Sequence, residues 1–245
     1  MGRVKSCLRA AVAAVLFPSI TIATISAGVE TDVNSRYVWR GLVQDKRPVI
    51  QPSAWGSVGN LEVNVWSNWP TSVEAGAAGP NELDFTATYS TAWAGTDIEP
   101  AAAVFWFPGQ AEAPATAELS LRVSRPVGPV AVFSEHSLDV WDYSGAYFGN
   151  VGAAFEHEVS PALMTTVSAS AGWGSPRFNT SYVGPTRWAL NVVEVGAEVT
   201  WQVLPFLYLR PHFGASALVD PELRTAAEKP AGLVVGLALG SGFQP

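Results

Sequence analysis

The sequence predicts an all-β protein: a transmembrane, antiparallel, up-and-down β-barrel of about twelve strands. Three observations predict this fold. Apolar and polar residues alternate with a period of two through six segments, which is typical of strands with two different faces. Short and long connections alternate along the chain. Tryptophan gathers at the ends of the predicted strands, as it does where barrel strands leave a bilayer.

Composition and charge narrow the class of protein. Only 14% of the 245 residues are charged, well below the roughly 25% typical of soluble globular chains. The net charge of -7 argues against a nucleic-acid partner, because phosphate contacts need clustered Lys and Arg. After residue 28, no apolar run approaches the roughly 18 to 20 residues of a membrane-spanning helix, which excludes a multi-span helical protein.

The first 28 residues have the order of a secretory signal peptide. Arg3, Lys5 and Arg9 come first, an apolar stretch over 11–25 follows, and small residues occupy 26–28. We therefore expect export, with residues 1–28 removed and residues 29–245 forming a single outer-membrane β-barrel domain. Because Cys7 would be removed, the mature chain would hold no thiol, which excludes a disulfide-stapled scaffold.

The predicted strands cover most of the remaining chain. Alternation is clearest over 61–69, 83–93, 113–124, 161–173, 188–203 and 233–243, and fainter over 29–40, 49–58, 97–107, 129–136, 146–159 and 206–219. Pro52, Pro100 and Pro211 fall inside these strands and cannot donate to a ladder, so bulges or strand ends are expected there.

The connections predict which end of the barrel faces which side. Short turns are expected at 59–60, 95–96, 126–128, 160–161 and 204–205, and the other six connections are longer. Tight periplasmic turns and longer external loops have this asymmetry. The predicted aromatic girdles consist of Trp39, Trp69, Trp106, Trp173 and Trp188 beside the long loops, with Trp93 and Trp201 beside the short turns.

A secreted β-sandwich is the alternative, because its strands also alternate. Several predicted strands reach about 10 residues, enough to cross a membrane at a tilt, whereas sandwich strands are nearer 5 to 6. The predicted inward faces also carry charged residues, which a sandwich core could not bury. Both features favour the barrel.

One segment resembles a family signature. Ser35-Arg36-Tyr37-Val38-Trp39-Arg40-Gly41 resembles the Ser-x-Tyr-Val-Phe-Arg-Gly motif near the mature N-terminus of the TorF-type porin family of Gram-negative outer membranes. In that family a polar loop and a Pro-x-x-Gln strand start follow, and Pro48-Val49-Ile50-Gln51 has that pattern here. The final strand, ending at Phe243, resembles the C-terminal aromatic signal read by barrel-assembly machinery, although Gln244 and Pro245 follow it. The resemblance implies an outer-membrane channel and brings no catalytic residues.

The charged residues assigned to the inward face are the candidate site. Arg36 and Arg40 share one face of the predicted strand 29–40, and Glu62, Glu82 and Asp84 face the same way by parity. Two interpretations stay open, a charged constriction that selects solutes and a structural ion network. Acids outnumber bases on this face, which favours a cation-preferring lumen; the further inward candidates are Glu118, Arg122, Glu156, Glu158, Glu194, Glu198, Arg210 and His212.

Passive diffusion of small hydrophilic solutes through a porin is the function these features favour. A plugged, non-conducting barrel with a structural or interaction role is the first alternative. An outer-membrane lipid hydrolase is the second, suggested by Glu135, His136 and Ser137. Adjacent His and Ser on a strand point to opposite faces, and no Gly-x-Ser-x-Gly elbow exists, so no catalytic site is expected. We expect outer-membrane lipids, small solutes and the barrel-assembly machinery as partners, and no cofactor, metal or nucleic acid.

Overall fold

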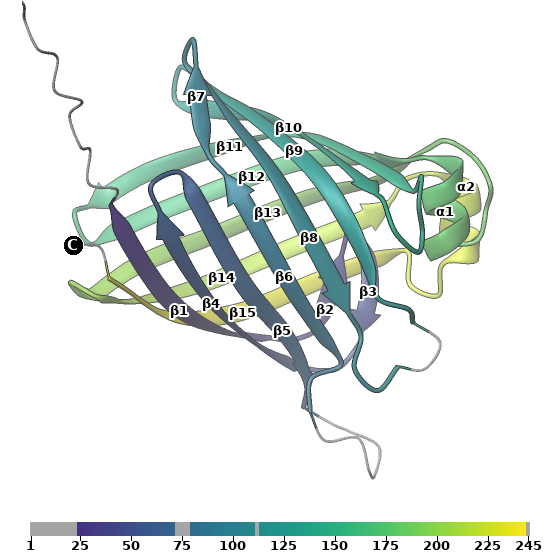
Figure 1. The fold of residues 1–245 in the computed structure, drawn as a ribbon, viewed down its shortest axis with the longest axis horizontal. Coiled ribbons are helices and arrows are strands. Elements are labelled where there is room, and N and C mark those ends of the chain that lie inside the picture. The colour runs from purple at the N-terminus through teal and green to yellow at the C-terminus, as the bar shows by residue number, and fades with distance from the viewer. Residues whose placement is uncertain (1–23, 72–78, 111–112, 244–245) are drawn as a thin grey trace, which may run out of the picture.

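A computed structural model describes residues 24–71, 79–110 and 113–243 as one closed antiparallel barrel (Figure 1). Over these ranges β6 and β7 follow one another as a single broken wall strand, which gives twelve wall strands. The pairing of β1 with β15, together with that of β6 with β8, closes the ring. The wall is formed by β1 (Ile25–Asn34), β4 (Val49–Val58), β5 (Leu61–Pro70), β6 (Glu82–Tyr89), β7 (Thr91–Trp93), β8 (Thr96–Trp106), β9 (Thr116–Val127), β10 (Val130–Asp139), β11 (Tyr147–Ser160), β12 (Leu163–Gly174), β13 (Ala189–Leu204), β14 (Leu207–Leu218) and β15 (Ala231–Phe243).

The wall strands have one apolar face and one polar face, as their sequences predict. In β1, Val29 and Val33 are exposed on the outside, whereas Glu30, Asp32 and Asn34 on the other face are covered to different degrees. The same holds in β15, where Leu233, Val235, Leu237 and Leu239 are all exposed. A closed ladder leaves no strand edge with unpaired backbone groups. The exposed apolar side chains form a continuous outer surface of the kind that a bilayer solvates.

The two ends of the barrel differ in the way the sequence predicts. Wall strands are joined at one end by tight turns that include Gly59, Gly95 and Gly128, each with a positive φ. The described chain also begins and ends at this tight-turn end (Figure 1). The long connections gather at the other end, where they form the hairpin of β2 (Tyr37–Trp39) and β3 (Leu42–Asp45) and the helices α1 (Pro176–Tyr182) and α2 (Pro221–Ala226). Neither described helix is long or apolar enough to cross a membrane.

The predicted first strand, 29–40, is wrong at both bounds. β1 begins at Ile25, and residues 1–23 of the expected signal peptide lie outside the described residues. β1 ends at Asn34, where the Ser35 backbone N–H still bonds the Val235 carbonyl before the chain leaves the wall. Arg40 and Gly41 then adopt φ values of 50° and 78°, which turn the chain back as the β2–β3 hairpin. Alternation continues through this bend, so the period of two did not reveal it.

The three strand prolines correct a second expectation. Each lies inside a wall strand and faces outward, not at a strand end or a register shift. Each nevertheless coincides with a gap in pairing to one neighbour. Pro52 falls in the unpaired step between β4 and β5, Pro211 in that between β14 and β13, and Pro100 lies where β6 breaks from β7. The missing N–H is therefore accommodated by losing ladder bonds on one side only.

Candidate functional site

The β2–β3 hairpin is anchored inside the long-loop end of the barrel by an ion pair. Arg40 donates two hydrogen bonds to the Glu118 carboxylate of β9, Nη1 to Oε1 at 2.8 Å and Nη2 to Oε2 at 2.6 Å. The two side chains are only 14% and 6% exposed. The Arg40 guanidinium also lies 4.4 Å from the ring centroid of Trp39 and 4.8 Å from that of Phe148. A bidentate pair with aromatic faces around it fixes both position and orientation.

The opposite side of the hairpin packs into a small apolar core. Gly41 fits against Val192 of β13 so closely that an added Cβ would lie 2.4 Å from Val192 Cγ2. Trp39 meets the rings of Phe178 and Tyr182 at centroid distances of 6.0 and 5.1 Å. This core therefore fills the long-loop end of the barrel, called the mouth below, on the side of β11, β13 and β14. Its buried members are Ala146, Phe148, Phe178, Ala189, Val192, Leu218 and Leu223.

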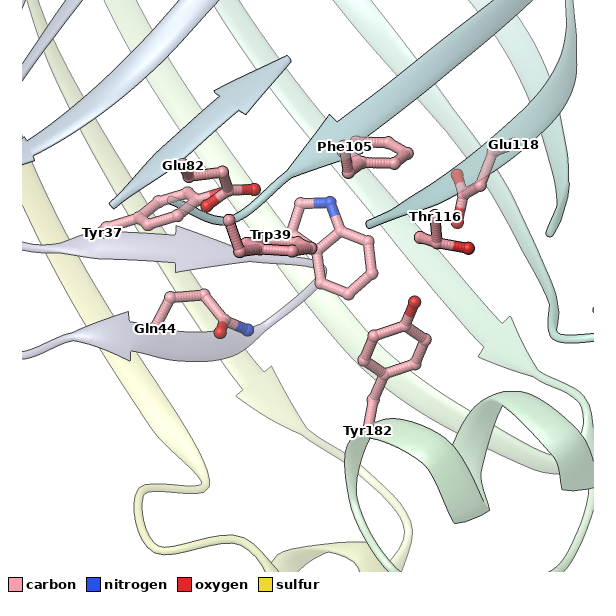
Figure 2. A pocket seen from close by; sticks show the side chains of 9 residues that line it. Tyr37, Trp39, Gln44, Glu82, Phe105, Thr116, Glu118 and Tyr182 are labelled. Carbon is pink, nitrogen blue, oxygen red and sulfur yellow. The ribbon is translucent and has the colours of Figure 1, made fainter. Parts of the chain in front are cut away.

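A pocket remains between the hairpin and the wall formed by β6, β8 and β9 (Figure 2). It has an empty volume of about 400 Å³, part of which is open solvent. Figure 2 shows Trp39 standing in its middle, with Glu82 and Phe105 on one side and Tyr182 on the other. The mouth is thus narrowed to an aromatic opening that carries two carboxylates, Glu82 and Glu118.

Two tyrosines of this opening are held neutral by their surroundings. Burial, reinforced by the nearby Glu82, raises the pKa of Tyr37 well above its usual value, and its hydroxyl donates to Glu82 Oε1 at 3.3 Å. Burial also raises the pKa of Tyr182 on α1, with Glu118 adding to the effect and Arg40 opposing it. Both phenols therefore stay uncharged to a higher pH than a free tyrosine, and Tyr37 serves as a hydrogen-bond donor to Glu82.

Below the hairpin, amide side chains form a continuous chain along the inner wall. Asn34 donates to Gln51, Gln51 donates to Asn68, and Asn68 donates to Asn81, at 2.9, 2.9 and 2.7 Å. His212 Nε2 lies 2.9 Å from Asn34 Oδ1, so the chain extends across Gly236 of β15 to β14. A side chain at 236 would collide with it, since an added Cβ would lie 2.2 Å from Asn34 Oδ1. The amides themselves carry no charge, but Asp32 and Glu82 lie beside them on the same inner face.

The structure brings some of the predicted site residues together and separates others. Arg40 reaches the lumen, but from the hairpin and not from a wall strand, and its partner is Glu118. Glu82 and Asp84 face inward at the long-loop end. Glu62 also faces inward, but it lies beside the tight turn after β4, at the opposite end, so it is not part of the opening. Arg36 lies between β1 and β2, and so it is not on a wall strand.

The remaining predicted charges line the wall in two networks. Arg122 lies between Glu99 and Glu135, at 3.8 and 3.3 Å. Arg210 bonds Glu30 at 2.7 Å and approaches Glu198 at 3.9 Å. Glu194 accepts a backbone hydrogen bond from Gly41, which ties the hairpin to β13.

Inward acids outnumber inward bases on the described wall. Of the three arginines in the described wall strands, the pairing register places Arg122 and Arg210 inward and Arg125 outward. The acids on the same face are Glu30, Asp32, Glu62, Glu82, Asp84, Asp97, Glu99, Glu118, Glu135, Asp139, Glu156, Glu158, Glu194 and Glu198.

Six of the seven predicted girdle tryptophans lie on the outside. Trp69, Trp106, Trp173 and Trp188 lie toward the long-loop end, and Trp93 and Trp201 toward the tight turns. Trp39 is the exception, because it belongs to β2 and packs inside the mouth. Phe178 and Tyr182 of α1 were not predicted as part of the site. The one local signal for this short helix is Ser175 followed by Pro176, a capping residue followed by proline at the first helical position.

Comparisons with known proteins agree on the fold. No family model and no curated protein matches the sequence. The chain is similar to the solved KdgM porin at 8% identity and a TM-score of 0.55, over 89% of this chain and 99% of that chain. It is similar to the NanC porin at 9% identity and a TM-score of 0.54, over 87% and 98%. A KdgM porin in complex with disordered oligogalacturonate matches at 10% identity and a TM-score of 0.51, over 89% and 98%. At these identities the likeness establishes the fold, which is that of porin-type barrels.

Proposed function

We propose that this chain is a porin of a Gram-negative outer membrane, which lets small hydrophilic solutes diffuse through its lumen. The observation that carries the proposal is the mouth: a charged lumen narrows at one end to a pocket beside a hairpin held by Arg40 and Glu118. The pocket beside the anchored hairpin lies where a solute would enter the lumen from the long-loop end. Export by the N-terminal segment, insertion by barrel-assembly machinery and membership of the TorF-type family belong to the same proposal. The resemblance of Ser35–Gly41 to that family's signature supports the last of these.

We further propose that the lumen prefers cations and neutral solutes. The surplus of inward carboxylates makes its potential negative, and a low-dielectric wall focuses that potential. The KdgM porin was solved with oligogalacturonate, an acidic sugar chain, and the acidic lumen described here would repel such a solute. Neutral and cationic solutes fit its charge better.

Reconstitution into a planar bilayer tests the proposal. We expect stepwise conductance, and in a KCl gradient a reversal potential of cation-selective sign that weakens toward 1 M salt, where the screening length is about 3 Å. Replacing Glu82 with Gln and Asp84 with Asn together should move the reversal potential toward zero. Glu228→Gln, an exposed loop carboxylate, is the matched control and should leave it unchanged. A folded barrel without any conductance would favour the plugged alternative.

A further inference from the structure

Two polar side chains lie side by side on the outer face of β10. Ser134 is paired with Val123 and Val151, and His136 with Leu121, so the register places both on the membrane-facing side. Ser137, the serine next to His136, instead faces the lumen opposite Ser120 and is 4% exposed. The prediction that His136 and Ser137 cannot form a pair is therefore confirmed. The serine that does reach His136 is two residues before it, on the same face of the strand.

The geometry is that of a hydroxyl, an imidazole and an orienting group. Ser134 Oγ lies 3.0 Å from His136 Nε2, and His136 Nδ1 lies 2.7 Å from the Tyr147 hydroxyl. Ser134 Oγ is also 3.3 Å from the backbone oxygen of Asn150, a longer contact. The His136 ring is stacked on Tyr147 and meets Trp173 edge-on, with both ring centroids 6.1 Å away. The imidazole is thus held from two sides with one nitrogen directed at the serine.

The pair lies at the level where lipid headgroups join their acyl chains. Tyr147 is the first residue of β11 at the long-loop end, and its ring lies 5.8 Å from that of Trp188. Trp173 and Trp188 belong to the aromatic girdle, which marks the interface. Polar side chains on a lipid-facing surface are costly and are typically functional.

The surface beside the pair is apolar. On β11 the register partners are Gly149 opposite His136 and Val151 opposite Ser134, and Val151 is 49% exposed. Trp173 covers Gly149 so closely that an added Cβ would lie 2.4 Å from Trp173 Cε2. An acyl chain of a membrane lipid would therefore lie along an apolar outer face beside the hydroxyl–imidazole pair.

We propose that Ser134 and His136 form a serine-esterase centre on the outside of the barrel, which cleaves the carboxylic ester of an acylated membrane lipid. The activity is separate from solute passage, because the two sites lie on opposite faces of the wall. With Nδ1–H donating to Tyr147, Nε2 presents its lone pair to Ser134. Tyr147 is the positioning residue.

The reaction balances with water as the co-reactant. Ser134 Oγ bonds to the ester carbonyl carbon while its proton passes to His136 Nε2. The bond from that carbon to the alcohol oxygen breaks, and the alcohol leaves with the proton from Nε2. Water then attacks the acyl-serine, giving one proton to Nε2, and the fatty acid leaves as the proton returns to Ser134.

The test uses the full-length barrel folded in detergent. We expect a biotinylated alkyl fluorophosphonate to label it, with the label on the peptide that contains Ser134. Ser134→Ala should abolish labelling and lower ester hydrolysis at least about 100-fold, as should His136→Asn. Ser137→Ala, the lumen-facing serine, is the control and should leave both unchanged. Micelles of a diacyl phospholipid and of lipopolysaccharide, assayed separately for released fatty acid, distinguish the two sources of an acyl ester.

The positioning role of Tyr147 predicts a change in kcat that a purely structural role would not produce. Tyr147→Phe removes the Nδ1 partner but keeps the ring, so kcat should fall while KM stays unchanged. Folded barrels that neither take up the fluorophosphonate nor release fatty acid from either lipid would overturn the proposal. Hydrolysis that survives Ser134→Ala would overturn it equally.

Discussion

Breaking the Arg40–Glu118 pair should release the hairpin from the mouth. The pair is bidentate, at 2.8 and 2.6 Å, and both partners are largely buried. Removing one partner of a buried pair typically costs about 3–5 kcal/mol, because the other charge is left uncompensated. Since each 1.36 kcal/mol is tenfold, the ratio of seated to released hairpin should fall by roughly 10² to 10³ or more in Arg40→Met. Glu118→Gln should act in the same direction.

Single-channel recording in planar bilayers measures this change directly. The Arg40→Met barrel should show a larger conductance than the parent, or a larger fraction of time in its widest state. Lys46→Ala is the matched control, because Lys46 also links the first loop to a distant one, through Glu228, but that pair is exposed. An exposed pair contributes about 0–1 kcal/mol, so this variant should resemble the parent.

The double variant Arg40→Met/Glu118→Gln adds a thermodynamic check. Residues that act as one pair are not additive, so the second replacement should add little to the first. If both single variants fold into barrels that change gel mobility on boiling, yet conduct like the parent, the ion pair does not hold the mouth narrow. The reasoning would then be refuted.

Three further predictions follow from the same structure. Gly41→Ala should also unseat the hairpin, through its left-handed φ and its contact with Val192, and Val192→Ala should restore part of the parent conductance. The buried phenols of Tyr37 and Tyr182 keep their protons in the folded state at pH values where the unfolded chain, with a tyrosine pKa near 10, has lost them. The stability they contribute is therefore complete below about pH 10 and is lost as the pH rises further, so conductance should keep its neutral-pH value up to about pH 10 and increase only above it. Finally, β1 begins at Ile25, so signal cleavage after Ala23, with small residues at Thr21 and Ala23, would keep the strand whole; intact mass should show a mature chain starting at Thr24 and not at Val29.

The wall could be predicted from the sequence because the information is local. The expected strand 49–58 has the bounds of β4, and 61–69 differs from β5 by one residue. Each wall residue faces either lipid or lumen, so the polarity of its side chain indicates which of the two it faces. The inward assignments of Glu82, Asp84, Glu194 and Glu198 depended only on this parity, and the pairing register places these residues on the lumen face.

The mouth could not be predicted because its contacts are not local. Nothing in the spacing of Arg40 links it to Glu118 in particular, as parity names the face of a strand but not the partner across a lumen. The prediction also placed Arg40 on the wall, since Arg36 and Arg40 continue the period of two of the inward face past the end of β1. The turn that separates wall from hairpin depends on two residues with positive φ, of which only Gly41 is of a type that favours it.

The seat of the hairpin also has a consequence for the order of assembly. The hairpin lies near the start of the chain, but Arg40 and Glu118 are 78 residues apart, and the core that receives Gly41 includes Val192, Leu218 and Leu223. Contacts between such distant segments carry a large loop-closure cost and slow folding. The hairpin is among the first segments to be synthesised, but it can be seated only after β9, β13 and β14 have joined the wall.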